Sequence, residues 1–144
     1  MLTLKWRRVM GCPPQEEYIF YQGEKFRVEF YFTDKGRMPA KEYLELVKEQ
    51  VKLKLFHFVK GIAENGKLFD EDKFRLVHRQ EKIYEFKPQE ERFFNFFYEG
   101  RRIIITNAYP KKSQKVNRRE LAKAINFKMD YEFRVKGGVY YENN

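Results

Sequence analysis

Residues 83–125 read IYEFKPQEERFFNFFYEGRRIIITNAYPKKSQKVNRRELAKAI, and this stretch decides the fold. It contains runs of aromatic and β-branched residues bounded by turn-forming residues, as strands do. With one similar run just before it, the predicted strands are residues 74–78, 82–87, 92–98 and 101–109. Glu99-Gly100 between the last two predicts a tight hairpin, and residues 88–91 separate the preceding pair. We therefore predict a mainly antiparallel sheet of about four strands. Its core would take in Phe93, Phe94, Phe96, Phe97 and Tyr98.

A short helix follows the predicted sheet. Residues 118–126, RRELAKAIN, place Leu121, Ala122 and Ile125 inward, and Asn117 with Glu120 three positions later makes a capping box. Beyond it, the tail of residues 131–144 either adds a strand or lies over the surface.

The residues before the quoted stretch predict a strand and a helical hairpin. Residues 25–33 alternate with period two, so they form an N-terminal strand. Pro39 suits the first turn of a helix. Apolar residues then recur at spacings of three and four up to Asn65-Gly66: Leu44, Val47, Val51, Leu55, Phe58 and Ile62. One long helix would also satisfy this pattern, but about 26 unbroken residues is long here, so we favour a hairpin broken near residues 49–52. Residues 1–23 are treated as an N-terminal extension, in which EEYIFYQG at residues 16–23 forms either a short strand or an arm.

The composition is typical of one cytoplasmic domain. With 144 residues we expect a single domain over 1–144, whose core is residues 24–130. Cys12 is the single cysteine and cannot form an internal disulfide, so a reducing cytosol fits best. We expect no secretory signal and no membrane association, since no segment reaches roughly 18 unbroken apolar residues. One cysteine with His57 and His78 cannot build a closed zinc site, so we expect no metal and no other cofactor.

The positive charge of the chain is concentrated in one region. Thirty Lys and Arg against 21 Asp and Glu give a net charge of +9, which attracts polyanions. Residues 101–119 contain seven cations and no acid: Arg101, Arg102, Lys111, Lys112, Lys115, Arg118 and Arg119. Cations can offset the charge on a phosphate, and a Lys crowded by other cations has a lowered pKa and can transfer protons. Metal-free cleavage of RNA needs both abilities. A merely solubilising loop would explain the same lysines.

The order of motifs resembles the RelE/HigB superfamily of toxins, particularly its phage Gp49-like branch. The motifs are Tyr84-Glu85-Phe86-Lys87, Arg92-Phe93, the strand from Ile103 to Tyr109, Lys111-Lys112-Ser113-Gln114-Lys115, and Glu120 with Ala122. The segment PAKEYLELV at residues 39–47 also resembles the helical hairpin of that family. Lys87 stands where the family often has Arg, and Asn117 stands where it usually has Pro. The resemblance covers about residues 25–130 and implies a RelE-like α+β fold.

The resemblance implies that the chain is the toxin of a type II toxin–antitoxin system, a metal-independent endoribonuclease that cleaves mRNA, often on the ribosome. Its partners would be a cognate antitoxin, mRNA and the ribosome. Two alternatives stay open on the same sequence. One is a ParE-like inhibitor of DNA gyrase, and the other is a non-catalytic, phage-derived nucleic-acid-binding protein.

The candidate catalytic residues are Lys87, Arg92, Lys111 and Lys112. Alternation along neighbouring strands would put Lys87 and Arg92 on one face with residues 109–112. We predict that Lys87 and Arg92 stabilise the phosphate, and that Lys111 or Lys112 binds phosphate or transfers a proton. An ordinary surface ion pair of Arg92 with Glu85, Glu90 or Glu91 is the competing interpretation. The predicted RNA-binding residues are Arg101, Arg102, Tyr109, Gln114, Lys115, Arg118 and Arg119, with Tyr109 either stacking on a base or packing in the core.

Overall fold

A six-stranded sheet forms the centre of the molecule, in the order β1-β2-β6-β5-β4-β3. The computed structural model describes residues 11–67 and 70–142. The strands in that part are β1 (Ile19–Gln22), β2 (Arg27–Phe30), β3 (Phe74–His78), β4 (Ile83–Phe86), β5 (Glu91–Tyr98) and β6 (Arg102–Pro110). Its helices are α2 (Gln15–Tyr18), α3 (Pro39–Leu46), α4 (Glu49–Asn65) and α5 (Arg118–Lys136). None of these helices is long and apolar enough to cross a membrane.

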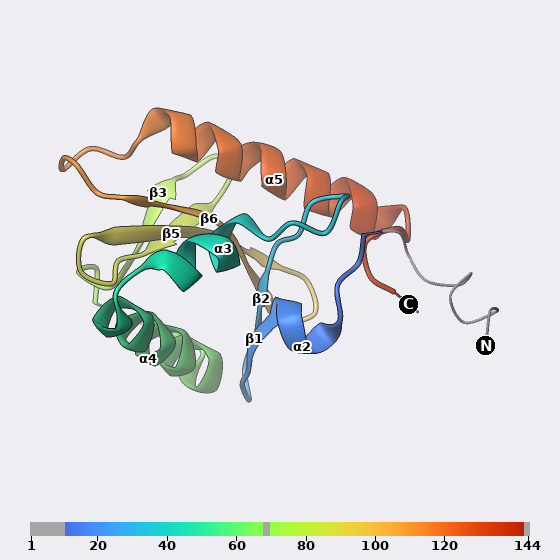
Figure 1. The fold of residues 1–144 in the computed structure, drawn as a ribbon, viewed down its shortest axis with the longest axis horizontal. Coiled ribbons are helices and arrows are strands. Elements are labelled where there is room, and N and C mark those ends of the chain that lie inside the picture. Colours follow the sequence, from blue (N-terminus) through green and yellow to red (C-terminus); the bar gives the residue numbers. More distant parts are fainter. Residues whose placement is uncertain (1–10, 68–69, 143–144) are drawn as a thin grey trace.

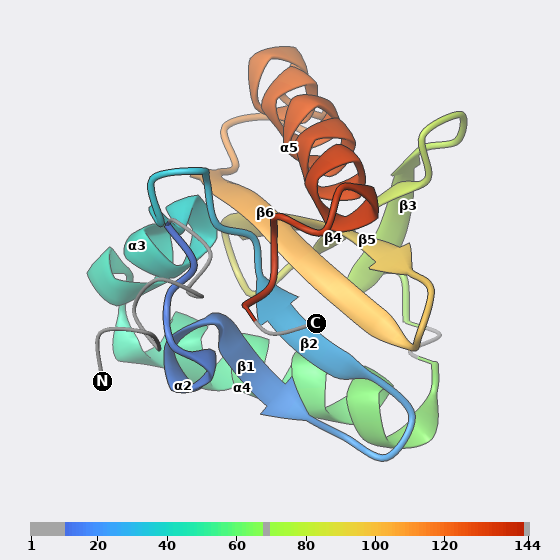
Figure 2. The ribbon, with the colours of Figure 1, turned by 90° about the vertical axis from the view of Figure 1, so that its right-hand side faces the viewer.

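The sheet has helices on both sides. Helix α5 packs on β5 and β6, while α3 packs on β6 and β2 and α4 packs on β1 and β2. Figures 1 and 2 show α5 on one face of the sheet and α3 with α4 on the other. Because both faces are covered, consecutive residues of the central strands are buried, and Phe93, Phe94 and Phe96 have no exposed surface. The prediction of an aromatic core is confirmed for these three; Phe97 and Tyr98 are half-buried.

The sheet is larger than the four strands predicted. Strands β3 to β6 are the predicted four, paired antiparallel. The predicted N-terminal strand joins them as β2, which lies parallel to β6, with Val28 opposite Ile103. Residues of the supposed N-terminal extension then add β1 as an antiparallel edge strand. Tyr18 just before it is 3% exposed, and its ring centroid lies 5.3 Å from that of Phe32. The described part of the extension therefore belongs to the core, and residues 1–10 lie outside the described residues.

The predicted division into two helices is confirmed, with the break slightly earlier than predicted. Helix α3 begins at Pro39 and ends at Leu46, and α4 begins at Glu49, so Val47 and Lys48 separate them. Val51, Leu55 and Ile62 of the apolar stripe face the core. Gly66 ends α4 with φ 85°, a left-handed conformation that a glycine adopts without a steric penalty.

The C-terminal helix is twice as long as predicted, and the tail is not a strand. Asn117 caps α5 as expected, since its Oδ1 accepts a hydrogen bond from the backbone N–H of Glu120 at 3.0 Å. The helix continues to Lys136 because Tyr131, which has no exposed surface, packs on Phe96 at 5.5 Å. After the helix, Tyr140 stacks on Phe32 with ring centroids 4.0 Å apart. The tail therefore closes the core around the N-terminal strands.

Candidate active site

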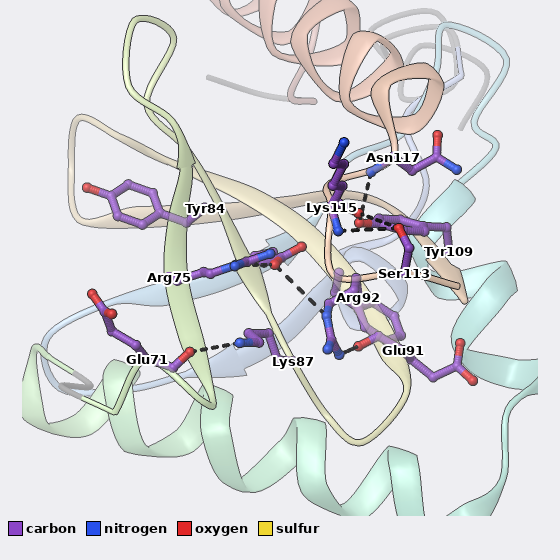
Figure 3. A network of polar contacts seen from close by, with 12 residues as sticks. Glu71, Arg75, Tyr84, Lys87, Glu91, Arg92, Tyr109, Ser113, Lys115 and Asn117 are labelled. Atoms are coloured by element: carbon purple, nitrogen blue, oxygen red, sulfur yellow. Dashed lines mark hydrogen bonds and ion pairs between the residues drawn. The ribbon is translucent and has the colours of Figure 1, made fainter. Parts of the chain in front are cut away.

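A cavity of about 420 Å³ lies where β4 ends, β5 begins and β6 runs into the loop before α5. We call it the basic cavity. Its nine lining residues are Lys54, Phe58, Asp72, Lys73, Lys87, Gln89, Arg92, Lys111 and Gln114. Five of these side chains are cationic and only Asp72 is acidic, so the cavity attracts anions. Figure 3 shows the part of this site around Lys87 and Arg92.

Arg92 is a buried cation held in a fixed position. Its side chain is 8% exposed, and Nη1 donates 2.8 Å hydrogen bonds to the backbone carbonyls of Gln89 and Glu91. Pro88 and Gln89 form the turn into β5, and Gln89 has φ 55°. Because of this turn, the backbone carbonyls of Gln89 and Glu91 both face the guanidinium of Arg92. Such a guanidinium needs little reorganisation to meet a phosphate.

A buried carboxylate lies behind Arg92. Glu85 has no exposed surface, and its Oε2 accepts a 2.6 Å hydrogen bond from Arg75 Nε and lies 3.9 Å from Arg92 Nε. Its other oxygen, Oε1, has no hydrogen-bond partner among the residues that the structure describes. Arg92 thus does pair with Glu85, but inside the protein and not as the surface ion pair considered above.

Lys87 projects into the same cavity from the end of β4. Its Nζ donates a 3.0 Å hydrogen bond to the backbone carbonyl of Glu71, and its backbone N–H donates to the carbonyl of Lys73 at 2.8 Å. Figure 3 shows Lys87 between Glu71 and Arg92. Burial, and then the positive charges of Arg75 and Arg92, lower the pKa of the Lys87 ammonium. A lysine so placed can exchange protons closer to neutral pH than an exposed one.

Lys111 and Gln114 reach the cavity from the loop after β6. The backbone N–H of Lys111 donates a 2.8 Å hydrogen bond to the carbonyl of Glu90, which ties the start of this loop to the turn before β5. At its far end the N–H of Asn117 donates to the hydroxyl of Tyr109 at 3.4 Å. These two bonds bring the loop beside Arg92, as Figure 3 shows.

The structure brings together four predicted site residues and separates the others. Lys87, Arg92, Lys111 and Gln114 all line the basic cavity. Lys112 and Lys115 are exposed on the same loop but do not line it, and Arg118 and Arg119 are exposed at the first turn of α5. These four can only extend the basic surface.

Arg101 and Arg102 lie at the opposite end of the β5–β6 hairpin from Arg92. They line a separate hollow with residues of the β1–β2 turn. Arg102 there donates to the hydroxyl of Tyr131 at 3.3 Å and lies over the ring of Tyr98. Arg101 and Arg102 were predicted to bind RNA, and the structure places them outside the basic cavity. Arg101 and Arg102 are close in sequence to the lysines of the loop after β6. However, they lie at the start of this nine-residue strand, and the lysines follow its end.

Tyr109 packs in the core. It is 7% exposed, and its ring centroid lies 5.3 Å from that of Phe94. Of the two roles considered for it, the structure therefore favours packing over stacking on a base. Burial raises the pKa of its hydroxyl.

Five residues of the basic cavity were not predicted as site residues: Lys54, Phe58, Asp72, Lys73 and Gln89. Lys54 and Phe58 lie one helical turn apart on α4, and Lys73 directly precedes β3. Phe58 had been counted as part of the apolar stripe, and the two lysines lie outside the matched motifs. The i, i+4 spacing of a cation and an aromatic at the border of the stripe was the available signal.

The chain thus has an α+β fold with helices on both faces of the sheet and, at one end of the sheet, a cavity whose lining is mostly cationic. The family model for phage-derived Gp49-like proteins (DUF891) matches residues 42–128. This match spans more than half of the chain, so the chain belongs to the Gp49-like family, a member of the RelE/ParE-like toxin superfamily. No curated protein matches the chain.

Proposed function

We propose that this protein is the toxin of a type II toxin–antitoxin system and cleaves mRNA in the basic cavity without a metal ion. The observation that carries the proposal is the convergence of Lys87, Arg92 and Lys111, from three separate segments, on one cavity. Membership of a toxin-like family supports it. Cleavage would join the ribose 2′-oxygen to phosphorus and release the 5′-oxygen of the next nucleotide.

Arg92 is the proposed phosphate-stabilising group. Its Nη1 and Nε are directed to the carbonyls of Gln89 and Glu91 and to Glu85, which fixes the plane of the guanidinium. Negative charge grows on the phosphate oxygens as the 2′-oxygen attacks. A positioned, desolvated arginine favours that state over the ground state, and removing one such donor slows a reaction by roughly 10²–10³-fold.

Lys87 is the proposed general base, and Lys111 the proposed general acid. The sequence favoured Lys87 for phosphate binding, but its lowered pKa suits it better to accept the proton of the 2′-hydroxyl. Lys111 lines the same cavity from the loop after β6 and would protonate the departing 5′-oxygen. Both protons are then accounted for by side chains of this chain.

The proposed partners are mRNA, the ribosome and a cognate antitoxin. The anionic backbone of RNA complements the five cations of the cavity. An antitoxin that presents acidic residues to these cations would block the site, which is the simplest way to silence it.

Induction of the protein in bacterial cells, followed by mapping of mRNA 5′ ends, tests the proposal. The wild type should create new in-frame ends, and Lys87→Gln should reduce them by at least about 100-fold, as loss of a general base does. Lys60→Gln is the matched control, since Lys60 is exposed on α4 and does not line the cavity. DNA damage without new ends would instead favour a gyrase inhibitor, and the absence of any growth effect would favour a binding protein without activity.

A further inference from the structure

One wall of the basic cavity is aromatic. Phe58 is the one aromatic residue among the nine that line it. Its side chain is partly exposed, and no ring contact with another aromatic side chain covers it in the described part of the chain. Other aromatic rings near the site already pack against a neighbouring ring: Phe94 packs against Tyr109, and Tyr84 stacks on Phe74 with centroids 5.2 Å apart.

One lysine lies over this ring, and a second lines the same cavity. Lys73 Nζ lies 5.8 Å from the ring centroid of Phe58. Lys54 lies one turn before Phe58 on α4 and lines the same wall. An aromatic face flanked by lysines is the arrangement with which proteins hold single-stranded nucleic acid, where the ring takes a base and the cations take the phosphates.

The cavity is also larger than a phosphate group requires. Its volume of about 420 Å³ falls within the roughly 300–1,000 Å³ that is usual for sites of whole small molecules. Lys87, Arg92 and Lys111 line it together with Phe58, Lys54 and Lys73. The space therefore suits a nucleotide with its base, and not the backbone alone.

We infer that Phe58 is a stacking platform for one base of a single-stranded RNA, and that Lys54 and Lys73 bind the phosphates beside it. This inference rests on the proposed function in one respect, namely that RNA is the substrate. A base inside a duplex is already stacked, so the platform selects single strands. Because every base has a π face, it selects no particular sequence.

Binding of uncleavable RNA tests the platform separately from the chemistry. The probe is a fluorescent 2′-O-methyl RNA hexanucleotide, which lacks the attacking hydroxyl, and a matched hexanucleotide with one abasic position. Fluorescence anisotropy with the full chain should show tighter binding of the complete strand. Phe58→Leu should weaken that binding about tenfold and abolish the preference over the abasic strand, and Phe58→Trp should retain both.

Phe56→Leu is the matched control. Phe56 lies on the same helix and is 37% exposed, but it packs against Phe20 and Tyr21 away from the cavity. It should bind both strands as the wild type does. Thermal melting of each variant checks that the fold is intact.

Three results would overturn the inference: a Phe58→Leu variant that keeps the wild-type preference, a wild type that binds the two strands equally, or a wild type that binds neither. Base-dependent binding by a wild type that creates no new mRNA ends would remove the nuclease and leave the platform. New mRNA ends, together with RNA binding that does not change when Phe58 is replaced, would support the nuclease and overturn the platform.

Discussion

The Nε of Arg92 lies 3.9 Å from the Oε2 of Glu85, inside a protein interior where Glu85 has no exposed surface. The same oxygen accepts the hydrogen bond from Arg75. The buried carboxylate of Glu85 thus pairs with both Arg75 and Arg92. Arg92 in turn lines the basic cavity, which has five cationic side chains. Without that carboxylate, Arg75, Lys87 and Arg92 would repel one another.

Replacing Glu85 with Gln should therefore damage both stability and activity. The neutral amide leaves Arg75 and Arg92 without a counter-charge, and breaking a buried pair in this way costs about 3–5 kcal/mol. Urea unfolding measures the free energy, and mapping of mRNA 5′ ends measures cleavage. Glu99→Gln, in the exposed hairpin turn, is the control. A Glu85→Gln variant as stable and as active as the wild type would mean that the carboxylate plays neither role.

Arg92→Ala should destabilise the fold as well as abolish cleavage. From the sequence alone one expects its melting temperature to be nearly unchanged, but the burial of Arg92 beside Glu85 reverses that expectation. Arg92→Lys keeps a charge near Glu85 and loses the planar fork that grips phosphate. It should melt close to the wild type and still lose cleavage. If Arg92→Lys cleaves normally, a positive charge alone suffices at this position.

Cleavage should rise with pH and then level off for as long as Lys111, the proposed general acid, keeps its proton. A general base works only when neutral, so protonation of Lys87 below its pKa removes activity, and the plateau lies above that pKa. Because burial and neighbouring cations lower this pKa, the plateau should begin below the roughly 10.4 of an ordinary lysine. Single-turnover cleavage on purified ribosomes at a series of pH values measures the curve. A rate that falls across this range as pH rises would exclude Lys87 as the base.

RNA binding should weaken steeply with salt, and each phosphate contact should contribute to the slope. For single strands the slope of log K against log salt changes by about 0.7 for each phosphate neutralised. Lys73→Gln should reduce the slope by about that amount. Lys60→Gln, on the exposed side of α4, should leave it unchanged. Equal slopes for all three proteins would place Lys73 outside the interface.

Removal of the Tyr141 hydroxyl, in the C-terminal tail, should destabilise the fold and leave cleavage in the basic cavity unchanged. Tyr141 donates a 2.6 Å hydrogen bond to Oε1 of Glu29, which has no exposed surface, and burial raises the pKa of Glu29. Tyr141→Phe leaves this oxygen with one partner fewer, at a cost of about 1–3 kcal/mol. Urea unfolding should show that loss, while cleavage at a temperature where the variant is folded stays at the wild-type level. Unchanged unfolding would mean that water replaces the hydroxyl.

The elements of the fold could be predicted where the pattern is local. Gly66 and Asn117 mark ends of helices because their own backbone and side chain make the cap. The extent of α5 could not be predicted, since apolar residues alternate with polar ones along its second half (FKMDYEFRVK, residues 127–136), a pattern typical of a strand, and the helix there is held by the packing of Tyr131 against strand residues. Strand β1 was one of two possibilities for its segment and could not be chosen from the sequence, because an edge strand of four residues gains its stability from its partner.

The site was predictable only as far as its motifs extend. Lys87, Arg92 and Lys111 lie in consecutive strands and loops, so the antiparallel order was enough to bring them together. Lys54 and Lys73 come from elements that approach this end only through the packing of α4 and β3, which no local pattern encodes. Arg101 and Arg102 show the opposite case. They are close in sequence to Lys111, but they lie at the other end of the β5–β6 hairpin.

Because Tyr140 stacks on Phe32, this part of the core can be completed only late in the synthesis of the chain. Strand β2 leaves the ribosome long before its parallel neighbour β6, and the ring that seals it comes near the last residues described. An emerging chain therefore cannot finish this core until residue 141 has cleared the exit tunnel.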